Sequence, residues 1–478
     1  MTWLWSIVKL INGCVLALLL VQSVIYLAQL VVAFIELRQH RRRASRTDPW
    51  WMLTSGVALP ISILVPAHDE EETVVENVRS MLALHYPDFE VIVVNDGSRD
   101  RTLAVLIEAL GLQKVERVWH AAVPHQEIRA LYGSPRHPRL LVVDKINGGK
   151  SDALNAGINL SRFPLFCAVD ADSLLDHDSL LQVMRPFIEE PEEMVAVGGR
   201  ICIVNGCTVR AGQVVDIALP ARPLALLQSI EYIRAFLIAR LAWSRLGAML
   251  IISGAFGLFK RSAAIQVGGY SHDTVGEDME IVVKLHRHFR ERGQKYQMRY
   301  AADSVCWTQA PETFGVLRRQ RTRWQRGMMQ TLAKHRAMVF NPKYGPAGTL
   351  GMGYFFFFDI LGPIIELAGL LLIPISFYMG AVTSDFFLAW VALTFTYGVF
   401  LSASALLLEM MVTRTTRARD LALLTMSAVL ENFGYRQLNN LWRLEGIWQF
   451  LTGKQGWGAM QRTKFQKASR EGPIPPKG

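Results

Sequence analysis

The stretch Arg318-Arg-Gln-Arg-Thr-Arg-Trp-Gln-Arg326 divides the chain into two unlike parts. The roughly 260 residues before it carry strand and helix signals of a water-soluble domain, whereas long apolar runs suited to a bilayer follow it. The i, i+3, i+4 spacing of Gln320, Arg323 and Trp324 places these side chains on one side of a helix. Two interpretations stay open. The stretch is a positive-inside flank of a membrane segment, or it binds a planar anionic ligand through guanidinium and indole groups.

Length and composition indicate an integral membrane protein with a water-facing domain. At 478 residues the chain exceeds one ordinary domain, and it is 51% hydrophobic yet 19% charged. Its net charge of +10 is concentrated beside apolar runs, which suits lipid headgroups and argues against nucleic acid as a partner. The five cysteines lack metal-ligand spacing, so we expect free thiols in a reducing compartment.

Three apolar runs are predicted to span the membrane, at about Ile11–Leu37, Thr349–Met379 and Asp385–Val412. A single lysine precedes the first run and an arginine cluster follows it, so the positive-inside rule places the next domain in the cytoplasm. The shorter runs Leu421–Leu430 and Leu441–Leu451 are expected to be interfacial or re-entrant.

These features divide the chain into five segments. They are a transmembrane helix with a basic flank (1–46), a cytoplasmic α/β domain (55–310), an amphipathic interfacial helix (311–345), transmembrane and interfacial helices (346–452), and a basic cytoplasmic tail (453–478). Within the domain, Leu224–Leu250 is apolar but interrupted by charges, which predicts helices packed under the domain or on the membrane surface. In the third segment an apolar stripe would lie along the membrane, with Arg318, Arg319 and Arg326 toward the headgroups.

Strand and helix signals alternate through the α/β domain. The predicted strands are Ile61–Pro66, Glu90–Asn95, Leu140–Val143 and Leu165–Val169. This alternation predicts a mostly parallel sheet with helices on both faces, in which ligands bind beyond the carboxyl ends of the strands. Asp69, Asp96 and Asp170 all fall at such ends.

Two polar features near these ends suit a phosphate-bearing ligand. In extended backbone Asp170 and Asp172 point to the same side, so they can share one hard cation; a solvated turn is the alternative. Lys150 follows two glycines at a predicted helix N-terminus, which suits a phosphate contact or a purely structural turn.

Two later stretches also allow either a ligand-binding or a purely structural interpretation. Ser253 and Gly254 lie in Ile251–Gly257, where glycines permit close approach of a ligand or tight packing. Glu277 and Asp278 open a predicted helix, where acids are ordinary capping residues or one of them is a general base.

The order of these motifs resembles the D, D-x-D, (T/G)ED and Q-x-x-R-W signature of family 2 glycosyltransferases. The matching positions are Asp96, Asp170 with Asp172, Asp278, and Gln320-Arg-Thr-Arg-Trp324. The resemblance covers about Ile61–Gly327 and is closest to the processive, membrane-embedded branch that includes cellulose, hyaluronan, chitin and poly-N-acetylglucosamine synthases. It implies that the cytoplasmic domain has the Rossmann-like GT-A fold and is embedded between transmembrane helices.

The resemblance also implies a set of site residues. The donor-binding positions are Pro66, His68, Glu70, Asp96, Lys150, Asp152, Asp170, Gln320, Arg323 and Trp324. The acceptor-binding positions are Ser253, Gly254, Glu277 and Trp324. Asp278 would be the base that deprotonates the acceptor hydroxyl, and Asp170 with Asp172 would hold Mg²⁺ or Mn²⁺ at the donor diphosphate.

The implied activity is an inverting, processive β-glycosyltransferase that transfers sugar from a UDP-sugar to a growing polysaccharide in the plasma (bacterial inner) membrane. Export of the product through the protein's own helices, with or without accessory secretion subunits, is left open. Single transfer to a lipid, giving a glycolipid, and a catalytically inactive channel or scaffold are the alternatives. The chain departs from the family pattern in two places. His68-Asp69-Glu70 stands where many relatives have Tyr-Asn-Glu, and Gly276 replaces a common Thr, so this motif does not specify the sugar.

Overall fold

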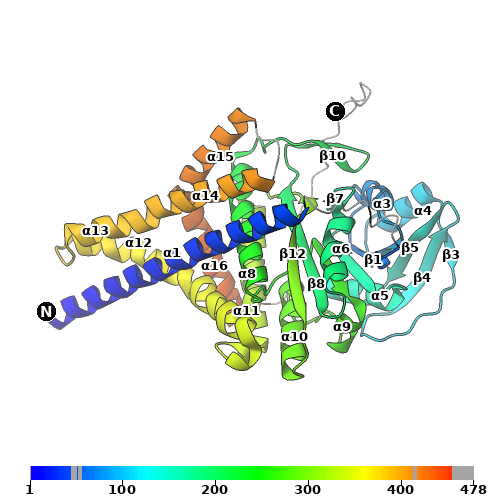
Figure 1. The fold of residues 1–478 in the computed structure, drawn as a ribbon, viewed down its shortest axis with the longest axis horizontal. Helices are drawn as coiled ribbons and strands as arrows, with labels where there is room; N and C mark the ends of the chain where they lie inside the picture. Colours follow the sequence, from blue (N-terminus) through cyan, green and yellow to red (C-terminus); the bar gives the residue numbers. More distant parts are fainter. Residues whose placement is uncertain (1, 45–50, 52–55, 413–416, 455–478) are drawn as a thin grey trace.

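The computed structural model describes residues 2–44, 51, 56–412 and 417–454. Figure 1 shows a mixed α/β domain on one side and long helices projecting from it on the other. The predicted basic tail 453–478 lies outside the described residues except for its first two positions. All five cysteines are free thiols, as expected.

A ten-stranded sheet forms the centre of the domain, in the order β3-β4-β5-β2-β1-β6-β11-β8-β12-β7. Its strands are β1 (Ile61–Ala67), β2 (Phe89–Asp96), β3 (Gln113–Val115), β4 (Ile128–Ser134), β5 (His137–Lys145), β6 (Leu165–Val169), β7 (Leu174–Leu175), β8 (Met194–Ile203), β11 (Phe256–Lys260) and β12 (Gln297–Thr308). A separate hairpin consists of β9 (Thr208–Arg210) and β10 (Gln213–Asp216). All four predicted strands are confirmed.

The prediction of a mostly parallel sheet is wrong outside the centre. The strands β5, β2, β1 and β6 run parallel, and β8 pairs with β12 in parallel. In contrast, β11 lies antiparallel between β6 and β8, and β4 forms an antiparallel hairpin with β5. A short turn can join only antiparallel neighbours, whereas a parallel pair needs a crossover. The sheet is therefore mixed, with a parallel core.

Helices cover both faces of the sheet because the central strands are apolar on both sides. Ile63 and Val65 pack with α3 (Val74–Leu82), α4 (Thr102–Leu110) and α6 (Ser179–Glu189). Leu64, between them, points to the opposite face and packs with α5 (Lys150–Leu160) and α10 (Glu277–Glu291). The remaining helices of the domain are α7 (Pro223–Tyr232), α8 (Arg240–Arg245), α9 (Arg261–Gln266) and α11 (Phe314–Lys334).

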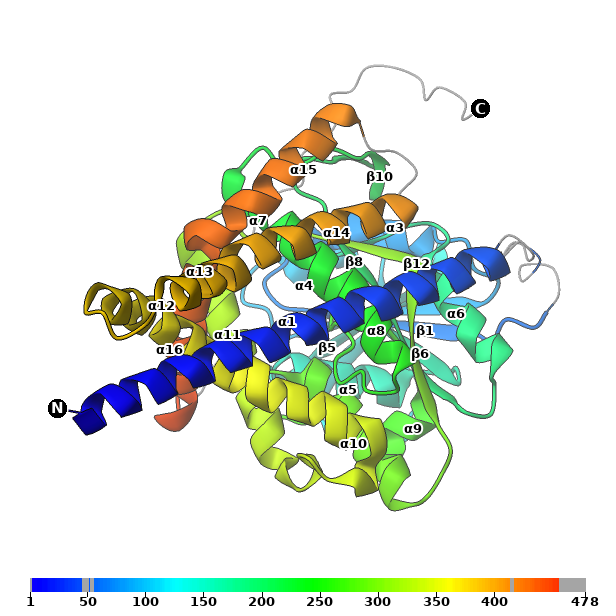
Figure 2. The same ribbon diagram turned by 60° about the vertical axis from the view of Figure 1, so that its left-hand side comes forward.

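Three helical segments are long and apolar enough to cross a membrane: Ser6–Arg41, Ala347–Tyr378 and Ser384–Val412. They coincide with the three predicted spans. The helices involved are α1 (Thr2–Ala44), α12 (Gly362–Tyr378), α13 (Ser384–Val391) and α14 (Tyr397–Val412). Figures 1 and 2 show α1 and α14 side by side across the domain, and the helical run of α7 and α8 packs beneath them. The expectation of packed helices in Leu224–Leu250 is confirmed.

The last two helices, α15 (Ala418–Leu430) and α16 (Arg436–Leu451), meet at a bend. The bend is at Phe433 and Gly434, whose backbone angles are not helical, and Gly434 adopts a φ of 97°. From there α16 packs along α11, so α11 is covered by protein on that side. Arg318 pairs with Glu445 at 2.7 Å, and Arg326 is only 3% exposed. The predicted headgroup role is therefore wrong for Arg326, whereas Arg318 and Arg319 both remain exposed.

Candidate active site

A cavity of about 1600 Å³ opens at the carboxyl ends of β1, β2 and β6 and continues between the helices. Nearly all of the site residues predicted from the sequence line it. From the sheet edge these are Pro66, His68, Glu70, Asp96, Lys150, Asp170 and Asp172. From the opposite side they are Ser253, Gly254, Glu277, Asp278, Gln320, Arg323 and Trp324. The parallel strands bring the first group together, because their carboxyl ends meet at one edge.

The loop after β1 turns sharply at Asp69, whose φ is +56°. Aspartate tolerates this left-handed conformation better than most residues, and its Oδ1 accepts a hydrogen bond of 2.7 Å from the Arg99 N–H. The turn brings His68 back over the end of β2, where its Nδ1 hydrogen-bonds the carbonyl oxygen of Asp96 at 2.9 Å. These contacts shape the end of the cavity beside the sheet.

The Asp96 carboxylate holds the glycine-rich turn that precedes α5. It accepts hydrogen bonds from the backbone N–H groups of Gly148 (3.0 Å) and Gly149 (2.7 Å). Lys145 donates to it at 2.5 Å, and parallel pairing of β2 with β5 places these two residues side by side. Asp96 therefore lines the cavity while its carboxylate is already engaged by protein donors.

Asp152 is the one predicted donor-binding residue that does not line the cavity. Its side chain is 1% exposed, pairs with Lys145 at 2.5 Å and accepts hydrogen bonds from the Gln126 N–H. It lies on the buried face of α5, behind the cavity wall, so its position favours a supporting role over direct contact with a ligand. The Lys145 that joins it to Asp96 was missed from the sequence, where only a lysine ending an apolar strand marks it.

Lys150, the first residue of α5, joins the two sides of the cavity. Its Nζ lies 2.5 Å from Asp170 Oδ1, 3.6 Å from Glu277 Oε1 and 3.4 Å from the Gly254 carbonyl oxygen. Burial lowers the pKa of Lys150, but the carboxylates of Asp170 and Glu277 outweigh this and raise it above its usual value. A Cβ on Gly254 would come within 2.9 Å of this Nζ, so a side chain there would displace the end of Lys150.

Two acids that line the cavity have raised pKa values. Burial, reinforced by the neighbouring Asp170, raises the pKa of Asp172 to about 6. Burial raises the pKa of Glu277 to about 7, although the Lys150 ammonium opposes the shift. Clustered, shifted acids in a cleft are typical of functional sites.

The Asp170 and Asp172 carboxylates fit a hard divalent cation. Mg²⁺ and Mn²⁺ prefer oxygen ligands, and burial of Asp172 against Asp170 disfavours two uncompensated negative charges. Among the described residues, no group of three or more His, Cys, Asp or Glu side chains forms a complete metal site. A cation at this position would therefore need further oxygens from a ligand or water.

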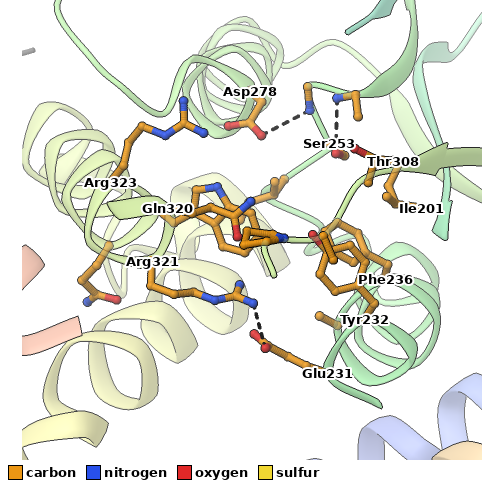
Figure 3. A pocket seen from close by; sticks show the side chains of 18 of the residues that line it. Ile201, Glu231, Tyr232, Phe236, Ser253, Asp278, Thr308, Gln320, Arg321 and Arg323 are labelled. Atoms are coloured by element: carbon orange, nitrogen blue, oxygen red, sulfur yellow. Dashed lines mark hydrogen bonds and ion pairs between the residues drawn. The ribbon is translucent and has the colours of Figure 1, made fainter. Parts of the chain in front are cut away.

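Asp278 lies at the start of α10, opposite Lys150. Its Oδ2 accepts a hydrogen bond of 3.2 Å from the Gly254 N–H, and its Oδ1 accepts one of 2.8 Å from Met279. Figure 3 shows the Asp278 carboxylate and the Arg323 guanidinium pointing toward one another across the cavity. The geometry leaves Asp278 oriented by two N–H groups and facing the open space.

The α11 helix supplies the opposite wall. Gln320, Arg323 and Trp324 all line the cavity, as their spacing predicted. Arg321 extends along a different side, where it pairs with Glu231 of α7 at 2.8 Å and stacks over the Trp324 ring at 4.4 Å. Glu231 was not recognised from the sequence, since an acid in an apolar helix gives no indication of its partner.

Beyond α11 the cavity runs between helices with charged and polar linings. Arg234 pairs with Glu431 at 2.7 Å, and Arg443 pairs with Asp359 at 2.7 Å. All four of these residues line the cavity. Charged pairs thus line the cavity well past the acidic cluster, among apolar side chains.

Comparisons with known proteins agree with this arrangement. The family described as Glycosyl transferase family 2 matches residues 62–267, and Glycosyl transferase family group 2 matches residues 165–416. A poly-beta-1,6-N-acetyl-D-glucosamine synthase of Staphylococcus epidermidis is 30% identical over 274 residues, covering 57% of this chain and 56% of that protein. The synthase of Staphylococcus aureus (strain N315) is 30% identical over 275 residues, with the same coverage of both chains. The chain thus spans about half the length of the curated relatives it matches.

Two solved structures match the chain at low sequence identity and with TM-scores below 0.5. A mannosyltransferase from Pyrobaculum calidifontis, in complex with GDP-Man and Mn²⁺, is 18% identical with a TM-score of 0.48, over 91% of this chain and 99% of that one. Residues 1–349 of Staphylococcus aureus TarS are 14% identical with a TM-score of 0.37, over 79% and 92% of the two chains. The family group 2 match alone spans more than half of the chain. With its mixed α/β, GT-A-like domain, this chain belongs to the family 2 glycosyltransferases.

Proposed function

We propose that the protein is an inverting, processive β-glycosyltransferase that extends a polysaccharide from a UDP-sugar, with UDP-N-acetylglucosamine as the first donor to test. One observation carries this proposal. A single cavity contains the acidic residues at the sheet edge, Asp278 and the Gln320–Trp324 motif, and it continues between the helices. The relatives that make poly-β-1,6-N-acetylglucosamine support the choice of sugar.

The proposed reaction is one displacement at the anomeric carbon of the donor. The acceptor hydroxyl oxygen forms the new bond as the bond to the diphosphate oxygen breaks, and the hydroxyl proton passes to Asp278. Attack from the face opposite the leaving group converts an α-linked donor into a β-linkage. Gly254 and Met279 orient Asp278 through their N–H groups, which leaves it directed at the acceptor.

Lys150 and Arg323 would stabilise the negative charge that develops on the leaving diphosphate. Both side chains line the same cavity as Asp278. Fixed positive charges in a partly buried site need little reorganisation during the reaction. Asp170 and Asp172 would hold a divalent cation, Mg²⁺ or Mn²⁺, which supplies further neutralisation of the diphosphate when bound.

We also infer that the growing product leaves through the helical part of the cavity. Gln22 and Tyr26 of α1, Arg234, and Asn440 of α16 line this part with groups that hydrogen-bond sugar hydroxyls. The three apolar helices and the basic flank after the first of them support a plasma-membrane location, the inner membrane in a bacterium, with the domain in the cytoplasm. The proposal also allows accessory secretion subunits as partners in the export of the product.

The test is product analysis with purified protein, radiolabelled UDP-N-acetylglucosamine or UDP-glucose, and Mg²⁺ or Mn²⁺. High-molecular-weight product from one donor is the expected result. A single labelled sugar on extracted lipid would replace processive synthesis with lipid glycosylation. No UDP release with any donor would favour an inactive channel or scaffold. Asp278→Asn protein is the matched control for contaminating activity.

A further inference from the structure

The segment that leads into α10 and the second half of α11 meet in a contact at the cavity wall, where Val275 and Gly276 line the cavity and Gly327 and Gln330 lie behind it. We call it the α10–α11 junction; it comprises Asp273, Thr274, Val275, Gly276 and Glu280 on one side and Gly327, Gln330, Lys334 and His335 on the other. Gly276 immediately precedes Glu277 and Asp278, and Gly327 follows Trp324 by three residues. The junction therefore joins the element that carries the proposed base to the element that carries the Gln320–Trp324 motif.

At its centre the two backbones touch at a pair of glycines. A Cβ on Gly327 would lie 2.7 Å from both Cα and N of Gly276. A Cβ on Gly276 would lie 3.0 Å from Cα and C of Gly327. Backbone atoms cannot move aside as the end of a flexible side chain can, so any side chain at 327 must separate the two elements. Glycine is a poor helix former, so its presence at position 327 inside α11 needs an explanation. The close backbone contact with Gly276 provides one.

Gln330, one helical turn beyond Gly327, fixes the same crossing by hydrogen bonds. Its Oε1 accepts from the Val275 N–H at 2.9 Å and from the Thr274 hydroxyl at 3.3 Å. The Thr274 hydroxyl oxygen in turn accepts from the Gly276 N–H at 3.0 Å. One amide oxygen of α11 thus holds the three residues that lead into Glu277.

An ion-pair cluster completes the junction at its far end. Glu280 is fully buried, and its Oε1 lies 3.2 Å from His335 Nε2 and 3.3 Å from Lys334 Nζ. Lys334 also pairs with Asp273 at 2.7 Å. The buried carboxylate and its partners come from α10 and α11, which resists sliding of one helix along the other.

We propose that Gly327 and Gln330 are positioning residues that set the distance and register between Asp278 and the Gln320–Trp324 motif. Neither residue lines the cavity, so each acts through the α10–α11 junction. The inference rests on the proposed function, in which Asp278 meets an acceptor bound against α11. Asp96 ends β2 and Asp170 follows β6, so both are held by the sheet edge, whereas Lys150 also contacts Glu277 at the start of α10.

The first test is Gly327→Ala, with Gly315→Ala as its control. Gly315 lies on the same helix, and the nearest atom to its added Cβ is Arg319 Nη1 at 3.8 Å, which is ordinary contact. A displacement of reacting groups by about 1 Å can cost up to about a hundredfold in rate, so turnover of Gly327→Ala at saturating donor should fall at least about tenfold. Its affinity for UDP should fall by a smaller factor than turnover, because Arg323 lies on α11 whereas Asp96 and Asp170 lie at the sheet edge. Gly315→Ala should match wild type in both.

A second pair of variants tests the junction without adding volume. Gln330→Met removes the oxygen that accepts these hydrogen bonds, whereas Gln330→Glu keeps an accepting oxygen. Gln330→Met should lose turnover and speed hydrogen exchange at the Val275 amide, and Gln330→Glu should restore both toward wild type. If Gly327→Ala protein does not fold, these two Gln330 variants test whether the α10–α11 junction positions Asp278.

The outcomes separate this inference from the proposed function. Wild-type turnover in Gly327→Ala or Gln330→Met, or loss of UDP affinity in proportion to turnover, would overturn the positioning role. If wild-type protein transfers no sugar, the proposed function fails instead. In that case the Val275 exchange rate still reports whether Gln330 holds the junction.

Discussion

The ammonium nitrogen of Lys145 lies 2.5 Å from Oδ1 of Asp96, with the lysine side chain fully buried beneath the glycine-rich turn. The same ammonium lies 2.5 Å from Oδ1 of Asp152. One buried cation thus compensates two buried carboxylates, one of which lines the cavity. Removing one partner of a buried ion pair leaves an uncompensated charge, which costs more than the pair itself contributes.

Lys145→Met should therefore destabilise the protein and weaken UDP binding together. We expect the free energy of unfolding to fall by about 3–5 kcal/mol, because Asp96 and Asp152 both lose their cation. Thermal unfolding and UDP binding by calorimetry measure the two effects. Lys114→Met, at an exposed position of β3, is the control and should change neither. Wild-type UDP affinity in Lys145→Met would show that Asp96 does not depend on this pair.

Asp278→Asn should abolish sugar transfer while UDP binding is largely kept. Asparagine can still accept the Gly254 N–H bond through its amide oxygen, but it cannot take a proton from the acceptor. Loss of a general base typically costs about 10²–10⁴ in rate. Initial rates and UDP titration measure the two properties. An equal loss of both would contradict the assignment of Asp278 as the base.

The raised pKa of Glu277 predicts a pH dependence of stability in the absence of donor and metal. Between the unfolded value near 4.5 and the folded value of about 7, the folded protein binds more protons than the unfolded chain. This contribution to stability is present below about pH 4.5 and is lost as the pH rises through 7. We expect the melting temperature of wild type to decrease more between pH 5 and about 8 than that of Glu277→Gln. Parallel curves for the two proteins would refute the shift.

Trp324→Ala should reduce transfer more than it reduces the amount of membrane-inserted protein. The indole is 39% exposed and lines the cavity, where its face can contact a sugar. Transfer and membrane-fraction yield are measured together. Trp448→Ala, at a 66% exposed tryptophan of α16 outside the cavity, is the control. If both variants only lower membrane insertion, Arg318–Arg326 is a membrane flank and not a ligand site.

Chelation should remove transfer, and added Mg²⁺ or Mn²⁺ should restore it. The oxygen donors Asp170 and Asp172 suit these ions, and loss of Asp172 leaves one carboxylate already paired with Lys150. Asp172→Asn should therefore require a higher metal concentration for half-maximal transfer. Full activity in excess chelator would exclude a metal-dependent reaction.

The local pattern of apolar and polar residues was sufficient to predict much of the fold and of the candidate site. Strand β1 is a continuous apolar run because both faces of the central sheet are covered by helices. This run can be recognised in the sequence without knowing which strands lie beside it. The i, i+3, i+4 spacing of Gln320, Arg323 and Trp324 placed all three in one cavity wall. The three candidate spans follow from length and apolar composition alone.

Other features depend on residues far apart in the chain. The antiparallel insertion of β11 between β6 and β8 has no local sequence signature. Side chains alternate between the two faces of a strand with the same period, whether the neighbouring strand is parallel or antiparallel. The sequence pattern suggested that Arg326 reaches lipid headgroups, but this residue is buried on the side of α11 that α16 covers, where it donates to Gln449. Arg318 stays exposed and pairs with Glu445, 127 residues away.

By itself, then, the sequence determined the elements with a strong local period, the three apolar spans and the order of the acidic and Gln320–Trp324 motifs. Only the tertiary structure decided that Asp152 lies behind the cavity wall, that Lys145 supports Asp96, and that Gly327 sits against Gly276. The reason is physical. Periodicity reports which face of one element is buried, whereas ion pairs and backbone contacts depend on which elements become neighbours.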